Sequence, residues 1–466
     1  MYKLKMRALA FAVLLSVVAA ADASAARAAP RLKVAPDGRF LLKDDGSPFF
    51  YLGDTAWELF HRLDREEADE YLRDRAARGF TVIQAVVLAE LDGLGVPNPY
   101  GHLPLKGRDP TRPDEAYFRH VDYVVNRARE LGLHVGMLPT WGDKWNKKWG
   151  VGPEVFTPGS AERFGEFLGR RYRESPVIWI LGGDRSPESD AHLAIVRALA
   201  KGLKKGDAGR HLMTYHPMGG ASSSRWFHGD DWLDFNMFQS GHSAKDAPNY
   251  EHTAADYRLA PFKPTLDGEP RYEDHPVDWK PEEKGWFDDF DVRQAAYWSM
   301  LAGACGHTYG NHNIWQMWRP GREPISYART PWRKALSHPG AAQMGHLRRL
   351  FESRPFLGLA PDQTLLAGDP VGGAGHLRAA RAADGGFAFA YTPEGRKLVV
   401  ALGKIKGDFV RAYWYNPRDG ASTFAGRFGG GGTREFAPPS SGRGHDWVLV
   451  LDDESRGFPP PGAKKS

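Results

Sequence analysis

The sequence contains a single cysteine, Cys305, among its 466 residues. One thiol cannot form an internal disulfide, and its place in the small-residue run LAGACGHTYG favours a buried position over a nucleophilic role. A chain without disulfides must be stabilised by a large hydrophobic core, which a chain of this length can form. The sequence therefore excludes a small disulfide-stapled fold.

Long hydrophobic runs are also scarce, and the clearest is the N-terminal stretch from Ala8 to Ala21. It follows Lys3, Lys5 and Arg7 and precedes the small-residue stretch ADASAA. This order is typical of a cleaved secretory signal peptide, and the run is too short to span a bilayer comfortably. We predict a signal peptide over residues 1–25, export to the periplasm or the medium, and no stable membrane insertion.

Charge of one sign is not concentrated anywhere in the chain. The 62 Lys and Arg residues and 57 Asp and Glu residues are interspersed without blocks and give a formal net charge of +5. A nucleic-acid-binding protein usually carries a basic stripe or patch, which this distribution does not provide. We therefore expect no nucleic-acid partner.

Several sequence motifs that would assign other chemistry are missing. No Gly-x-Gly-x-x-Gly opens a helix after the first predicted strand, and no Gly-x-Ser-x-Gly occurs. Metal-dependent barrel hydrolases usually carry His-x-His at the first strand, where this chain has GDTAW. His307 and His312 lie close in HTYGNHN, but no carboxylate accompanies them. We expect no cofactor and no catalytic metal.

From Arg31 to about Leu350 the chain repeats one pattern: a short apolar strand, a polar loop and an amphipathic helix. FTVIQAVVLAE and PVIWILGGD are typical strands of this repeat, and EAYFRHVDYVVNRARELG is a typical helix. About eight such units in one domain favour a (β/α)₈ barrel over an open sheet. We predict an α/β fold with this barrel over residues 30–350.

The pattern changes beyond the last predicted helix. Short alternating runs such as GFAFAYTP and WVLVLDD are separated by Gly, Pro and Asp, which predicts a small antiparallel β-sandwich over residues 356–453. No long linker separates it from the barrel, so we expect it to pack there as a support module. A carbohydrate-binding role is the alternative. Residues 454–466, which end in PPPGAKKS, are predicted to be a disordered tail.

Barrel enzymes carry their chemistry on the loops at the carboxyl ends of the strands. Two of these ends present a carboxylate directly after glycine: Asp184 in GGD and Glu269 in DGE. Two carboxylates facing each other across a barrel mouth are what glycosidic bond cleavage needs, one to protonate the leaving oxygen and one to attack or stabilise the sugar carbon. The alternative for each acid is a salt bridge to its neighbour, Arg185 or Arg271.

Aromatic and amide side chains at other strand ends support a sugar site, because flat rings stack on sugars and amides or imidazoles bind hydroxyls. The tryptophans of TWGDKWNKKWG could instead form one stripe of a loop helix, and IWQMW could cap the barrel. By their position at strand ends, the predicted substrate-binding residues are Asp54, Trp57, Gln84, Trp141, His216, Gln239, His242, Tyr272 and His312.

Together, the motifs FFYLGDTAWELFHRL, LPTWGDKW, WILGGDR, TYHPMGG, NMFQSGH, LDGEPRYED and HTYGNHNIWQMW resemble the apiosidase-like catalytic domain of glycoside hydrolase family 140. The β-rich module resembles the C-terminal domain named for collagen binding that follows it in such proteins. The resemblance implies a retaining, exo-acting glycosidase with Asp184 as acid/base and Glu269 as nucleophile. The activity known in the family releases apiose from side chains of a pectic polysaccharide.

Two other functions remain open for the same scaffold: a catalytically silent carbohydrate-binding protein and an endo-acting polysaccharidase with an open groove. In each case the partner is an oligosaccharide or polysaccharide. If the retaining mechanism holds, Glu269 must stay ionised through hydrogen bonds from Tyr272 or His216, and Asp184 must hold a proton near neutral pH. Arg185 is then expected to point away from Asp184.

Overall fold

The computed structural model describes residues 30–368 and 371–463. The predicted signal peptide, residues 1–25, lies outside this part of the chain. None of the helices in the described ranges has the length and apolar character to cross a membrane. A small antiparallel sheet of β1 (Leu32–Val34), β2 (Leu41–Lys43) and β3 (Pro48–Phe49) precedes the first large domain.

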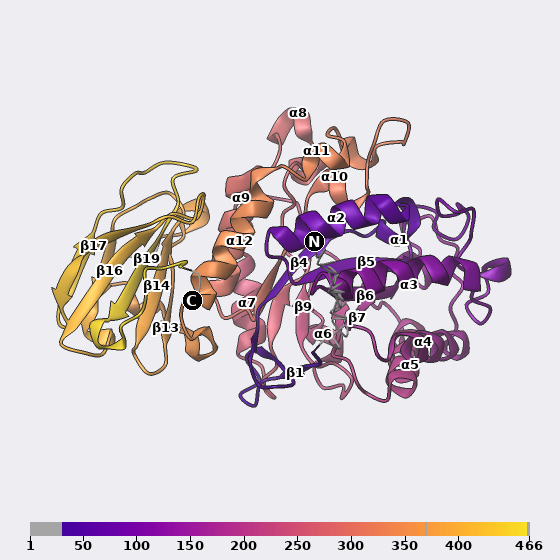
Figure 1. Cartoon of the computed structure of the whole chain (residues 1–466), viewed down its shortest axis with the longest axis horizontal. Helices are drawn as coiled ribbons and strands as arrows, with labels where there is room; N and C mark the ends of the chain where they lie inside the picture. The colour runs from indigo at the N-terminus through magenta and orange to yellow at the C-terminus, as the bar shows by residue number, and fades with distance from the viewer. Residues whose placement is uncertain (1–29, 369–370, 464–466) are drawn as a thin grey trace, which may run out of the picture.

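The first domain is a closed barrel of parallel strands (Figure 1). A six-stranded sheet in the order β11-β4-β5-β6-β7-β8 and the pair β9-β10 make up its wall. Hydrogen bonds from Asp234 N to Met213 O (2.8 Å) and from Cys305 N to Thr265 O (2.9 Å) connect the two parts. The (β/α)₈ prediction is confirmed. The strands are β4 (Tyr51–Thr55), β5 (Val82–Leu88), β6 (His134–Thr140), β7 (Val177–Gly182), β8 (Met213–His216), β9 (Asn236–Phe238), β10 (Thr265–Asp267) and β11 (Gly306–Tyr309).

Helices cover the outside of the barrel, and their starts follow from the local sequence. Asp64 and Thr157 each form a capping box that satisfies the free N–H groups of the first turn. Gly202 lets two helices touch, because a Cβ there would lie 2.1 Å from Glu162 O. The helices of eight residues or more are α2 (Arg65–Ala77), α3 (Glu115–Glu130), α4 (Pro158–Tyr172), α5 (Asp190–Asp207), α7 (Asn249–Tyr257), α9 (Asp289–Leu301) and α12 (Pro339–Glu352).

The second domain consists of two antiparallel sheets, as predicted for a β-sandwich. The larger sheet has the order β12-β13-β14-β19-β16-β17 and the smaller pairs β15 with β18. Along β14, Phe387, Phe389 and Tyr391 join the core shared with the barrel. The alternating Ala388 and Ala390 face the core between the two sheets. The strands are β12 (Leu359–Pro361), β13 (Arg378–Ala382), β14 (Phe387–Thr392), β15 (Leu398–Ala401), β16 (Phe409–Tyr415), β17 (Ser422–Gly429), β18 (Thr433–Phe436) and β19 (Trp447–Asp453).

The two domains are joined along α9 and α12, beside which the yellow sheets lie in Figure 1. Arg354 donates to both carboxylate oxygens of Asp452, at 2.8 and 2.7 Å. Arg293 forms the same bidentate pair with Asp446, at 3.1 and 2.9 Å. A buried charge without its partner would cost several kcal/mol, so these two ion pairs hold the two domains in one arrangement. The expected packing of the β-domain on the barrel is therefore present in the structure.

The C-terminal segment differs from its prediction. The phenyl ring of Phe458 packs edge-on against Phe387 at 6.0 Å and lies under the guanidinium of Arg354 at 4.9 Å. These apolar and cation–π contacts fix the segment on the domain junction. The expectation of a disordered tail is therefore wrong for residues 454–463.

Candidate active site

A cavity of about 740 Å³ opens at the carboxyl ends of the barrel strands. Its lining comes from the segments that follow all eight barrel strands, which is where a barrel enzyme places its chemistry. Three carboxyl groups and several aromatic rings line it: Glu90, Asp184, Glu269, Trp57, Trp141, Trp149, Tyr272, Trp279 and Trp315.

The two glycines before Asp184 have a structural reason. Gly182, Gly183 and Asp184 all adopt left-handed backbone conformations, with φ of 95°, 79° and 54°. A Cβ on Gly182 would lie 2.3 Å from the carbonyl oxygen of His216, so only glycine fits there. The strained turn directs the carboxyl of Asp184 into the cavity, where its side chain is 18% exposed.

The electrostatics of this position suit a proton donor. Burial, followed by the negative charge of Glu269, raises the pKa of Asp184 to about 7, although Arg185 and His216 oppose the rise. The expectation that Arg185 points away is wrong. Its Nη1 lies 3.1 Å from Asp184 Oδ2 and donates to the Asp184 carbonyl at 2.7 Å. A fully buried guanidinium needs acceptors, and the nearest ones belong to its own neighbour.

Glu269 lies in the opposite electrostatic situation. Burial alone would raise its pKa, but hydrogen bonds and charge interactions with two imidazoles outweigh burial and lower the pKa to about 2. His216 Nε2 lies 3.1 Å from Oε2, and His242 Nε2 lies 3.0 Å from Oε1. The two carboxyl groups therefore have pKa values far apart, which is the pattern of an acid and an anionic partner.

His216 connects the two acids. The backbone N–H of Asp184 donates to Nδ1 of His216 at 3.1 Å. A backbone N–H can only donate, so Nδ1 accepts this bond, and Nε2 is directed at Glu269 Oε2, 3.1 Å away. The turn that presents Asp184 thus also orients the imidazole that lies against Glu269.

The surrounding rings form a continuous aromatic lining. The indole N–H of Trp57 donates to the Tyr272 hydroxyl at 3.1 Å, and its ring lies 5.3 Å from Trp141. Burial, then the charge of Glu269, raises the pKa of Tyr272 well above its usual value, so its hydroxyl stays protonated. Apart from Glu269 Oε2, which lies 3.1 Å from His216 Nε2, three buried polar atoms on lining residues have no hydrogen-bond partner within the described ranges: Trp141 Nε1, Gln239 Oε1 and His242 Nδ1. They are suited to bind sugar hydroxyls.

Some predicted substrate contacts lie elsewhere. Asp54 points out of the barrel toward α2, where Arg75 Nε lies 2.6 Å away, so it does not line the cavity. Gln84 lies deep in the barrel and donates to Thr308 Oγ1 at 3.0 Å. Gln84 precedes the end of β5 by too far to reach the mouth, whereas Asp54 lies near the end of β4 but is directed away from the cavity. His216 is fully buried behind Glu269 instead of lining the cavity.

The other predicted contacts are among the lining residues: Trp57, Trp141, Gln239, His242, Tyr272 and His312. The cavity is also lined by four aromatic residues that were not predicted as substrate contacts: Trp149, Trp279, His275 and Trp315. The alternative of a tryptophan stripe does not hold, because Trp145 is buried whereas Trp149 is 60% exposed and packs on Arg185 at 4.0 Å.

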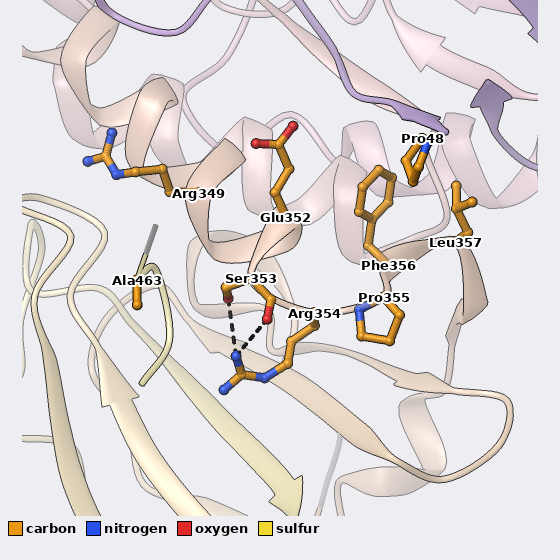
Figure 2. A pocket seen from close by; sticks show the side chains of 9 residues that line it. All are labelled: Pro48, Arg349, Glu352, Ser353, Arg354, Pro355, Phe356, Leu357 and Ala463. Carbon is orange, nitrogen blue, oxygen red and sulfur yellow. Dashed lines mark hydrogen bonds between the residues drawn. The ribbon is translucent and has the colours of Figure 1, made fainter. Parts of the chain in front are cut away.

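A second cavity, of about 590 Å³, lies at the domain junction (Figure 2). Its charged side chains are Arg349, Glu352 and Arg354. Figure 2 shows Arg354 turned back to Ser353, to which it donates at 2.9 and 3.3 Å. No pair of carboxyl groups meets among the residues that line this cavity, so we place the catalytic site at the barrel mouth.

The barrel and its two contrasting carboxyl groups define a glycoside hydrolase, and solved structures agree. A structure described as a glycoside hydrolase shares 34% identity and a TM-score of 0.85, covering 91% of this chain and 97% of its own. A glycoside hydrolase family 5 structure from Bacteroides vulgatus shares 32% identity and a TM-score of 0.84, covering 91% and 94%.

The family models make the assignment more specific. The model "Apiosidase-like, catalytic domain" matches residues 35–358, and the chain belongs to this family. The model "Putative collagen-binding domain of a collagenase" matches residues 360–452. Both resemblances seen in the sequence are confirmed. No curated protein matches the chain.

Proposed function

We propose that the protein is an exo-acting, retaining glycosidase that releases a terminal neutral sugar, apiose or a related pentose or hexose, from side chains of pectic or other plant polysaccharides. The observation that carries the proposal is the pair of cavity carboxyls with separated pKa values, about 7 for Asp184 and about 2 for Glu269.

The pKa of Glu269 favours retention over inversion. An inverting enzyme needs a general base, and a base with a pKa of about 2 accepts protons poorly near neutral pH. The same carboxylate can attack carbon, since it is always ionised. In the proposed sequence Glu269 forms a bond to the anomeric carbon while Asp184 gives its proton to the departing oxygen. Asp184 then takes a proton from water, which attacks the same carbon and releases Glu269.

The charge of the cavity supports a neutral substrate. Glu269 lines it as an anion, whereas no lysine or arginine occurs among the described residues of that lining. An acidic or sulfated sugar would meet repulsion without a compensating cation. Trp279 and Ser326, which lie well beyond the ends of β10 and β11, also line the cavity, which suits a pocket for a chain end.

The order of residues over 1–25 supports export, so we place the enzyme in the periplasm or outside the cell. There it would meet polysaccharide fragments.

The test compares wild type with Asp184→Ala and Glu269→Ala on pectic oligosaccharides and on 4-nitrophenyl glycosides, with the released sugars identified. We expect one terminal sugar from wild type and none from either variant. An endo-acting enzyme would release internal fragments instead. A protein that binds a glycan but releases nothing would be the silent binding protein.

A further inference from the structure

Three consecutive strands deliver polar groups to one wall of the cavity. Glu90 follows β5, Trp141 follows β6 and Asp184 follows β7. The sheet continues past the strand ends: Trp141 N donates to Leu88 O at 3.0 Å, and Gly142 N donates to Gly183 O at 2.9 Å. Glu90 and Trp141 therefore lie on the same side of the cavity as Asp184.

The two-carboxylate reaction does not use Glu90. Its backbone is held because Leu91 N donates to Oε1 of Glu58 at 3.2 Å, and Glu58 is itself fully buried against His61. The carboxyl group of Glu90 has no hydrogen-bond or salt-bridge partner among the residues described, although it lines the cavity. Glu58 is thus a satisfied structural acid, whereas Glu90 presents an unbound carboxyl group to the substrate space.

Beside it, the indole N–H of Trp141 is also unbound, in a side chain that is only 3% exposed. A buried donor without a protein partner is free to donate to a ligand or to an ordered water. Burial, then the negative charges of Asp184, Glu58 and Asp143, raises the pKa of Glu90 to about 8. Near neutral pH Glu90 is therefore protonated and can both donate and accept a hydrogen bond.

In the proposed mechanism Asp184 protonates the glycosidic oxygen, so groups on its side of the cavity face the sugar that leaves. We propose that Glu90 binds a hydroxyl group of the leaving-group sugar, with the Trp141 indole as a second donor. Glu90 then determines specificity for the glycan that carries the terminal sugar. This assignment rests on the proposed function.

The test uses two substrates that end in the sugar wild type releases, starting with apiose: an oligosaccharide and the corresponding 4-nitrophenyl glycoside. Glu90→Met keeps the side-chain length and removes the hydrogen bonds, whereas Glu90→Gln keeps both donor and acceptor. We expect Glu90→Met to lower kcat/KM on the oligosaccharide about tenfold or more, and to stay within about threefold of wild type on the nitrophenyl glycoside. Glu90→Gln should stay within about threefold on both.

Thermal melting of each variant confirms that it folds. The inference is overturned if Glu90→Met leaves kcat/KM on the oligosaccharide unchanged. It is also overturned if Glu90→Met lowers kcat/KM equally on both substrates, because Glu90 would then act on the released sugar or on Asp184. A wild type that hydrolyses neither kind of substrate would remove the proposed function, and the role of Glu90 with it.

Discussion

Replacing Arg185 should move the pH dependence of the enzyme. The pKa of Asp184 is raised to about 7, and Arg185 is the first group that opposes the rise. Asp184 must be protonated to act, so kcat/KM should be high below pH 7 and fall as pH rises through that value. Arg185→Met removes the opposing cation, whereas Arg185→Lys keeps a positive charge and serves as the control.

The size of the effect follows from the ion pair. Unit charges 3.1 Å apart interact by about 5 kcal/mol at an effective dielectric constant of about 20. The guanidinium charge is spread over several atoms and water will enter the space, so this is an upper limit. One pKa unit corresponds to about 1.4 kcal/mol, and we predict an upward shift of at least about one unit.

The assay is kcat/KM from pH 4 to 10 on an oligosaccharide whose leaving group needs protonation. For Arg185→Met the alkaline limb should lie at least about one pH unit higher than for wild type, and for Arg185→Lys close to wild type. An unchanged limb in Arg185→Met would mean that Asp184 is not the group that titrates, or that the ion pair does not form in solution.

Three further changes test other parts of the structure. His242→Phe keeps an aromatic ring but removes a hydrogen bond to Glu269, so the pKa of Glu269 should rise. The acid limb of kcat/KM should then move up from about pH 2 by about one unit, and a limb that stays in place would refute that hydrogen bond. Gly182→Ala places a Cβ 2.3 Å from a carbonyl oxygen of β8, so the free energy of unfolding measured with urea should fall by at least about 1–3 kcal/mol; full stability would mean that the turn is relaxed. Arg354→Met leaves Asp452 buried and unpaired, which should cost about 3–5 kcal/mol in the same assay; a loss below about 1 kcal/mol would show that the domain junction does not depend on this pair.

The barrel could be predicted because its signals are local. Alternating strand and helix patterns, with glycine after the strands that end on Asp184 and Glu269, specify both the fold and the edge where the chemistry lies. Position after a strand also identified Trp57, Trp141 and Gln239 as residues near the cavity.

The side-chain directions could not be predicted in the same way. Asp54 lies on β4, and successive side chains of a strand point to opposite faces of the sheet. The outward direction of Asp54 is stabilised by Arg75 on α2, the next long helix in the chain. Arg185 was expected to turn away, but the acceptors that satisfy it are carbonyls of the loop at Asn146 and of Asp184 itself. Trp279 ends a short 3-10 turn (Val277–Trp279) well beyond the end of β10, so no periodic pattern indicated its place on the cavity wall.

The most direct test of the central claim is the stereochemistry of the first product. Proton NMR of an apiose-terminated oligosaccharide, recorded within minutes of adding wild type, identifies the anomer before mutarotation. A product with the configuration of the substrate is the predicted result, because Glu269 attacks first and water attacks second. A product of inverted configuration would contradict the role of Glu269 as the nucleophile. Water would then attack the anomeric carbon directly in a single step, with Glu269 assisting that attack.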